Sequence, residues 1–233
     1  MSFIITVYTH EGVVMAADSR LTLNAKVGEV TNEKTISFDF SNSTNKLFCT
    51  KRGVGISTCG NADIQGKPIA GFIEHFILQN NEAYVGDVAA KLLIHFRSLQ
   101  PGLKSIFHVS GYDSEGKQRI YKVNTETNSG NEINPGFLQG ATWDGENDVL
   151  IRLIQPCWLS DKDGKPQQAL PTFPIPWNFF SLQDAIDFAS FAMSATIGTL
   201  RFQNRLKTVG GPVDLLAIKP DGIVWVQRKS LHA

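Results

Sequence analysis

The chain has 233 residues, 42% of them hydrophobic, and its 22 lysines and arginines balance 22 aspartates and glutamates. This length and composition predict a single domain over residues 1–233, and the balanced charge argues against a basic face for nucleic acid or an anionic membrane. Because the three cysteines form no CxxC pair and no apolar stretch is long enough to span a membrane, we expect reduced thiols in a cytoplasmic protein without nucleic-acid or membrane partners.

The first part of the chain alternates short apolar runs with polar turns. The predicted strands are residues 4–8, 12–17, 35–40, 46–50 and 53–57. Apolar side chains then recur every three or four residues over 69–77 and again over 85–96, which is typical of one face of an amphipathic helix. The short polar linker between these two segments predicts an antiparallel helix pair on one face of a sheet.

The second part of the chain contains both kinds of element. Further strands are predicted over residues 105–112, 118–123, 212–218 and 222–228. A third helix is expected over 149–154, ended by Pro156, and a fourth opens with a capping box of Ser181 and Asp184 and ends near Gly198. Helices that come in pairs between strands do not suit a doubly wound parallel sheet. The order predicts a layered α+β sandwich.

Residues 157–180 differ in kind from the rest of the chain. They are charged at first and then contain "LPTFPIPWNFF", in which three prolines make regular structure improbable. We interpret this segment as an inserted surface loop. Its aromatic and proline side chains predict a lid or a contact between subunits.

Ser2 is a candidate nucleophile. Methionine followed by a small residue is the usual substrate of methionine aminopeptidase, so removal of Met1 is expected to place a free α-amine beside the Ser2 hydroxyl. An α-amine has an ordinary pKa of about 7.7 to 8.0, which suits a general base near neutral pH. One residue then supplies both the nucleophile and the base that activates it.

Three motifs resemble a known family. "GVVMAADSR" near the start, "GNAD" after a strand and "GGPVDLLAI" near the end are similar to the β-type subunits of proteasomes and their bacterial relatives, which are N-terminal nucleophile hydrolases. In that family the aspartate of the first motif lies sixteen residues after a catalytic N-terminal threonine. Counting back from Asp18 gives Ser2. The resemblance implies a four-layer αββα sandwich with two antiparallel sheets between helix layers.

The same resemblance implies a lysine that is held by Asp18 and lowers the pKa of the α-amine. Lys34 lies at the family's usual distance from Ser2, whereas Lys46 lies fourteen residues before Gly60, the family's usual distance to its oxyanion glycine. We choose Lys46, because the residues before it are interpreted as a lengthened hairpin. Lys34 stays the alternative.

Gly60 and four further residues complete the implied site. The backbone N–H of Gly60 corresponds to the donor that stabilises the tetrahedral oxyanion. The residues that fall where the family binds an extended peptide are Leu21, Thr22, Thr58 and Ala62. Cys59 beside Gly60 is expected to be a buried, unreactive thiol.

The chain departs from the family at three supporting residues. The family holds its nucleophile with an aspartate and a serine before the last double glycine, and with a serine in a GSG turn. We place Leu206, Val209 and Ala141 at these positions. Thr142, Asn204, Arg205 and Thr208 are the possible substitutes. Loss of the supports predicts weaker positioning of the nucleophile.

The resemblance therefore implies an N-terminal serine peptidase that acts on peptides or unfolded proteins and forms a homo-oligomeric ring, with any unfoldase partner unknown. No cofactor or metal is expected, because the sequence has no HExxH, no P-loop and no GxSxG motif. Two alternatives stay open. One is an amidase or an acyl or peptidyl transferase on a small substrate, and the other is a ring-forming scaffold subunit whose catalysis has decayed.

Overall fold

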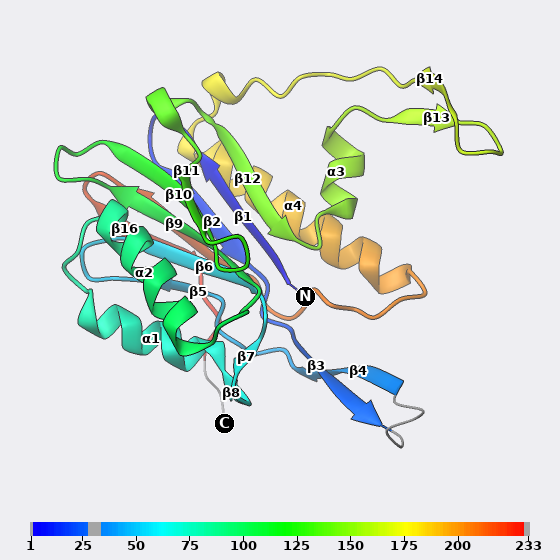
Figure 1. Cartoon of the computed structure of the whole chain (residues 1–233). Coiled ribbons are helices and arrows are strands. Elements are labelled where there is room, and N and C mark those ends of the chain that lie inside the picture. The colour runs from blue at the N-terminus through cyan, green and yellow to red at the C-terminus, as the bar shows by residue number, and fades with distance from the viewer. Residues whose placement is uncertain (1, 28–33, 231–233) are drawn as a thin grey trace.

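The computed structural model describes residues 2–27 and 34–230, and this part of the chain has a mixed α/β fold with four α-helices and several antiparallel sheets (Figure 1). Two of the sheets have five strands each. The first, called the β1 sheet, has the order β12 (Gly140–Gly145), β1 (Phe3–Tyr8), β2 (Val13–Ala17), β15 (Asp214–Lys219) and β16 (Gly222–Gln227). The second, called the β9 sheet, has the order β11 (Ser129–Glu132), β10 (Gln118–Asn124), β9 (Ser105–Tyr112), β6 (Gly55–Gly60) and β5 (Leu47–Cys49).

The remaining strands form two-stranded pairs. These pairs are β3 (Leu21–Val27) with β4 (Lys34–Ser41), β7 (Asp63–Ile64) with β8 (Lys67–Pro68), and β13 (Trp158–Ser160) with β14 (Pro166–Ala169). The helices are α1 (Ile69–Gln79), α2 (Val85–Leu99), α3 (Asp148–Ile154) and α4 (Leu182–Phe202), with short 3₁₀ turns at Pro135–Phe137 and Trp177–Phe179.

Three apolar clusters hold these elements together. One joins α1 and α2 to one face of the β9 sheet, and a second joins α4 and the start of α3 to one face of the β1 sheet. The third cluster contains residues from both sheets, including Ile4 and Met15 of the β1 sheet and Ile120 of the β9 sheet. Burial of this apolar area is the main force that orders the layers.

Strands β1 and β2 are buried along their whole length, because both of their faces are covered. Phe3 and Ile5 belong to the cluster under α4, whereas Ile4 and Tyr8 belong to the cluster between the sheets. Alternate side chains of a strand point to opposite faces, so both sets must be apolar. Thr6 is the polar exception within β1.

Most of the predicted elements are confirmed. The first hairpin, the paired helices and the last two strands form as expected, and Ser181 caps α4 through a reciprocal capping box with Asp184. Strands β3 and β4 pair antiparallel over Leu21–Val27 and Lys34–Ser41, as the interpretation of a lengthened hairpin requires. The prediction that α4 ends near Gly198 is wrong, since the helix continues to Phe202. A single glycine lowers helix stability by only about 1 kcal/mol, which tertiary packing overrides.

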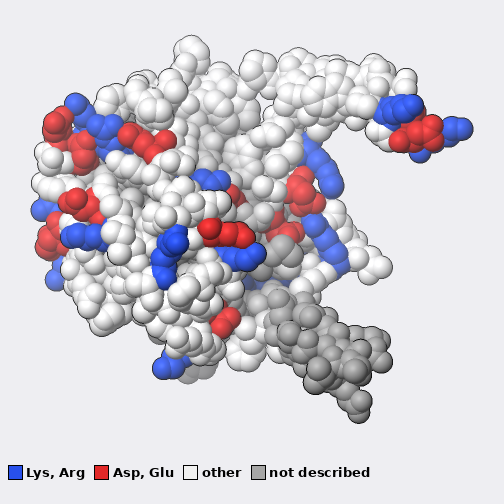
Figure 2. Space-filling model, viewed as in Figure 1, with Lys and Arg blue, Asp and Glu red and all other residues white. Residues whose placement is uncertain are grey.

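The interpretation of all of residues 157–180 as a loop is wrong, because β13 and β14 lie in the first half of this segment; the proline-rich part, residues 170–180, contains only the 3₁₀ turn at Trp177–Phe179, as its prolines predict. Strands β13 and β14 pair across a turn that Asp161 closes by accepting the backbone N–H groups of Asp163 and Lys165. Pro171, Pro174 and Pro176 lie after β14, and Pro166 is the first residue of β14, so the four prolines leave the pairing of Trp158 with Ala169 and of Leu159 with Gln168 intact. The hairpin projects from the body of the molecule, with charges of both signs at its tip (Figures 1 and 2).

Candidate active site

Asp18 and Lys46 form a buried ion pair. Lys46 Nζ lies 2.8 Å from Asp18 Oδ1 and also donates to the backbone oxygen of Arg20. Asp18 is fully buried and Lys46 is 5% exposed. Burial lowers the pKa of Lys46 below its ordinary value, although the Asp18 carboxylate acts in the opposite direction. The fold therefore holds a positive charge in a place from which water is largely excluded.

The Asp18 carboxylate also organises the backbone around the start of β1. Oδ1 accepts the N–H of Phe3 at 3.1 Å, and Oδ2 accepts the N–H groups of Arg20 and Gly210, both at 3.1 Å. Three chain segments that are distant in sequence meet at this one side chain. Asp18 is therefore more than a turn residue, because it fixes the backbone immediately after Ser2.

Lys46 is the lysine in contact with Asp18. It lies just before β5, where its backbone oxygen accepts the N–H of Thr58 at 3.0 Å. The alternative, Lys34, begins β4 opposite Val27 in the β3–β4 hairpin, and its side chain lies outside the described residues. The spacing to Gly60 therefore selected the lysine that meets Asp18.

Ser2 lies at the wall of a cavity of about 320 Å³. Ser2 is 6% exposed, and its backbone oxygen accepts the N–H of Glu146 at 2.8 Å. A Cβ atom at Gly145, where φ is +97°, would lie 1.8 Å from that oxygen, so only glycine fits beside Ser2. The cavity is lined by Ser2, Cys59, Gly60, Lys104, Ser105, Ile106, Asn124, Glu126, Asp144, Gly145 and Asn147.

Gly60 lines the same cavity and has a backbone conformation that favours glycine. Its φ is +108°, and a Cβ atom would lie 2.3 Å from the backbone oxygen of Lys104. Alternate N–H groups of a strand point to the same edge. The N–H of Thr58 points to Lys46, so the N–H of Gly60 faces that edge of β6 as well. The predicted donor therefore points away from β9, toward the side that carries Lys46.

The neighbouring thiol of Cys59 is buried, as expected. Burial raises its pKa to about 12, and the nearby Asp144 carboxylate acts in the same direction. The thiolate is the reactive form of cysteine, so a thiol with this pKa is a poor nucleophile at neutral pH.

The predicted substrate-binding residues do not line the cavity beside Ser2. Leu21 and Thr58 are buried, whereas Thr22 and Ala62 are partly exposed. Thr58 lies two residues from Ile56, which packs under the helices, so its side chain points away from the face between the sheets. The walls of the observed cavity come instead from the β9–β10 region and from the end of β12.

A second polar network, which the sequence interpretation missed, lies between the sheets. His108 Nε2 is 2.9 Å from Asp144 Oδ2, and His108 Nδ1 is 3.0 Å from Thr6 Oγ1. Lys122 Nζ donates to Asp144 Oδ1 at 2.7 Å. His108 and Thr6 are fully buried. No spacing in the sequence joins His108 to Asp144.

The placement of the supporting serine at Ala141 is wrong. Ala141 pairs with Val7, near the far end of β1, whereas Asp144 pairs with Ile4 and Gly145 pairs with Phe3. The end of β12 that reaches the start of β1 therefore carries Asp144. The error arose because the sequence did not reveal the register of β12.

The loop before the double glycine also contacts this region. Arg205 is 3.2 Å from Glu146 and 3.1 Å from Asp148, so one of the suggested substitutes for the lost supports binds the segment next to Ser2. Val209 is instead buried in the cluster under α4. At Gly210 a Cβ atom would lie 2.7 Å from the Arg20 guanidinium, so a side chain there would displace this guanidinium from Asn42 Oδ1 and from the backbone oxygen of Lys207.

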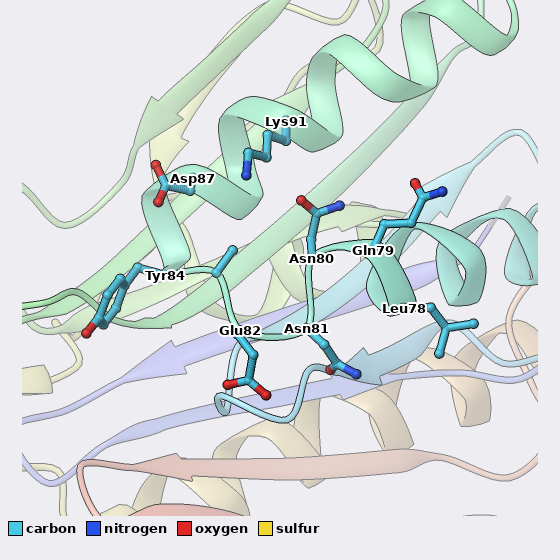
Figure 3. A pocket seen from close by; sticks show the side chains of 9 residues that line it. Leu78, Gln79, Asn80, Asn81, Glu82, Tyr84, Asp87 and Lys91 are labelled. Carbon is cyan, nitrogen blue, oxygen red and sulfur yellow. The ribbon is translucent and has the colours of Figure 1, made fainter.

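Another cavity, of about 410 Å³, lies at the turn between α1 and α2 (Figure 3). Its polar groups already serve the fold: Asn81 Oδ1 accepts the N–H of Lys51, and the backbone oxygen of Glu82 accepts from Arg52 Nε. The Arg52 guanidinium also stacks on the Tyr84 ring. These contacts tie the helix turn to the loop before β6.

The site has to be interpreted from its own residues, because no family model and no curated protein matches the chain. Within residues 2–27 and 34–230, no three His, Cys, Asp or Glu side chains are grouped so that they could hold a metal ion. No helix in the same ranges has the length and apolar character needed to cross a membrane.

Proposed function

We propose that the chain is a proteasome-like N-terminal serine hydrolase that cleaves amide bonds of peptides or unfolded proteins after Met1 has been removed. One observation carries this proposal: the buried Asp18–Lys46 pair binds the backbone of Phe3, directly after Ser2. Forming a buried ion pair requires the free energy to remove both charges from water, and removing one partner leaves the other charge buried and unpaired. A buried lysine fixed beside a chain terminus is well suited to tune an α-amine.

Ser2 would act through an acyl-enzyme. Its Oγ attacks the carbonyl carbon of an amide bond, and the hydroxyl proton passes to the α-amine. The C–N bond then breaks, and the leaving amine takes that proton, which leaves an ester on Ser2. A water molecule, deprotonated by the same α-amine, attacks the ester and releases the carboxylic acid with Ser2 restored.

The surrounding residues would supply the electrostatic part of the catalysis. The Lys46 ammonium disfavours a second positive charge nearby, so it lowers the pKa of the α-amine and keeps the base neutral. The N–H of Gly60 would donate to the tetrahedral oxyanion. Asp18 keeps Lys46 charged in its buried position. These roles suit a hydrolase that needs no cofactor.

The proposal extends to the architecture and the assembly. The helix clusters on the outer faces of the two five-stranded sheets are consistent with the four-layer αββα sandwich of the N-terminal nucleophile hydrolases. We propose a cytoplasmic homo-oligomeric ring to which the projecting β13–β14 hairpin contributes a subunit contact. Trp158 and Phe173 in this segment are 59% and 83% exposed, which leaves apolar area to cover.

One observation favours an amidase or transferase as the second candidate. The cavity beside Ser2 has a volume of about 320 Å³, near the lower limit of about 300 Å³ for small-molecule pockets. A cavity of this size suits one small amide substrate. Product analysis with peptides, unfolded proteins and added amine nucleophiles separates peptidase, amidase and transferase.

The proposed function is tested by intact-mass analysis with a β-lactone, a serine-reactive electrophile. Opening of the lactone by Ser2 adds the whole mass of the probe without a leaving group. We expect loss of Met1 and one addition, abolished in Ser2→Ala and retained in the exposed-serine control Ser43→Ala. Retention of Met1 would refute the proposal. Processed protein in which Ser2→Ala changes no activity would favour the decayed scaffold.

A further inference from the structure

A second charged network borders the cavity that contains Ser2. Asp144 lines this cavity, and its carboxylate is held from behind by His108 and Lys122. The Cys59 thiol lies within electrostatic reach of Asp144 and of Lys46. The network around Asp144 therefore borders the cavity directly, whereas the Asp18–Lys46 pair acts on it through the backbone next to Ser2.

The strand register brings Asp144 to Ser2. Ser2 bonds to Glu146 across the two strands, and Ile4 pairs with Asp144. Residues two apart on a strand share one face, so Ser2 and Ile4 point to the same side of the sheet as Asp144. Ser2 and Asp144 are then diagonal neighbours, a relation in which long or polar side chains come within reach of each other.

We propose that Asp144 is a positioning residue for the Ser2 nucleophile: His108 and Lys122 orient its carboxylate, which holds the α-amine of the processed chain by hydrogen bonding. This inference rests on the proposed function. The Asp144 carboxylate would take over the positioning that supporting hydroxyl and carboxyl groups provide in the family that the chain resembles.

The protonation states suit this role. Burial lowers the pKa of His108, which favours the neutral ring. Nε2–H then donates to Asp144, and Nδ1 accepts the hydroxyl proton of Thr6. Burial acts to raise the pKa of Asp144, but its hydrogen bonds from His108 and Lys122 prevail and hold it below its ordinary value. Asp144 therefore stays ionised and keeps a lone pair for the cavity.

The test measures the rate of β-lactone addition to the processed protein as a function of pH. Asp144→Asn removes a negative charge beside the α-amine, so the apparent pKa of labelling should move down. Lys122→Met removes a positive charge and leaves Asp144 uncompensated, so the apparent pKa should move up. Asp144→Asn is also expected to lower the labelling rate at neutral pH by about 10- to 100-fold. The other charged or titratable groups near this end of the cavity are Asp18, Lys46, Cys59, Lys104, Glu126, His108, Glu146, Arg205, Asp214 and Lys229.

Two matched controls come from the distant β9–β10 turn. Asp113 is bonded by Arg119, and Lys117 is paired with Glu115. Asp113→Asn and Lys117→Met therefore remove the same kinds of charge at the opposite end of β9 from Ser105, which lines the Ser2 cavity, and should leave both the rate and the apparent pKa unchanged.

The outcomes are distinct. Opposite shifts for Asp144→Asn and Lys122→Met, absent in the controls, support the inference. If the pH dependence of labelling does not shift in either variant, the inference is overturned. This holds even if both variants have a lower Tm, because a merely structural role affects stability alone. Should Asp144→Asn fail to fold, Lys122→Met decides by itself, since the Lys122 side chain is one-third exposed. Wild-type protein that takes up no probe refutes the proposed function instead.

Discussion

Replacing Lys46 by methionine removes one partner of a buried ion pair and leaves Asp18 charged with no exposed surface. Breaking such a pair from one side costs about 3–5 kcal/mol. Three backbone N–H groups still donate to Asp18, so we expect the lower value, about 3 kcal/mol. In a chain of this size about 1 kcal/mol lowers the Tm by about 2–4 °C, which predicts a drop of about 6–12 °C.

Thermal and guanidinium unfolding at pH 7 measure this loss. The control is Lys104→Met, because Lys104 is also 2.8 Å from its partner, Glu126, but both side chains are more than half exposed. Solvent-exposed ion pairs contribute little to the free energy of unfolding, so the Lys104→Met control should keep the wild-type Tm. The double variant Asp18→Asn/Lys46→Met should lose less unfolding free energy than the two single variants lose in sum, because the two side chains interact directly. Equal Tm values for the Lys46 and Lys104 variants, or strict additivity in the double variant, would refute the reasoning.

Three further predictions concern the cavity, the buried histidine and the projecting hairpin. Gly60→Ala should cost about 1–3 kcal/mol from backbone strain and abolish β-lactone addition, because its Cβ would lie 2.3 Å from Lys104 O; unchanged unfolding and labelling would contradict this. Burial lowers the pKa of His108 below 6.5, so the unfolded chain takes up the proton first as the pH falls, and stability should decline below about pH 6.5. Denaturant unfolding at pH 7.5 and 5.5 should show a smaller decline for His108→Gln, and equal declines would count against the assignment. Replacing residues 158–169 by a short Gly-Ser linker should leave the Tm of the dissociated chain unchanged, because β13 and β14 are exposed throughout; a drop of several degrees in the monomer would show that the hairpin stabilises the fold itself.

Local patterns predicted many of the elements. Apolar periodicity identified α1 and α2, and the capping pair Ser181 and Asp184 marked the start of α4, because both signals depend on neighbours within a few residues. Strand β12 was missed, since its residues carry no clear alternation and its pairing with β1 joins segments more than 130 residues apart. Such pairing depends on packing against the rest of the β1 sheet.

For the candidate site, the sequence by itself determined Ser2, Asp18, Lys46 and Gly60 as candidates, because the spacings implied by the family resemblance fall on them, with Lys34 as the alternative lysine. Only the tertiary structure decided that Lys46 meets Asp18, and that the Ser2 cavity is walled by residues other than the predicted substrate contacts. It alone also revealed the network of His108, Asp144 and Lys122. The physical reason is that the partners of a buried polar side chain depend on the strand register within each sheet and on how the two sheets pack face to face. The spacing of residues along the sequence does not encode either relation.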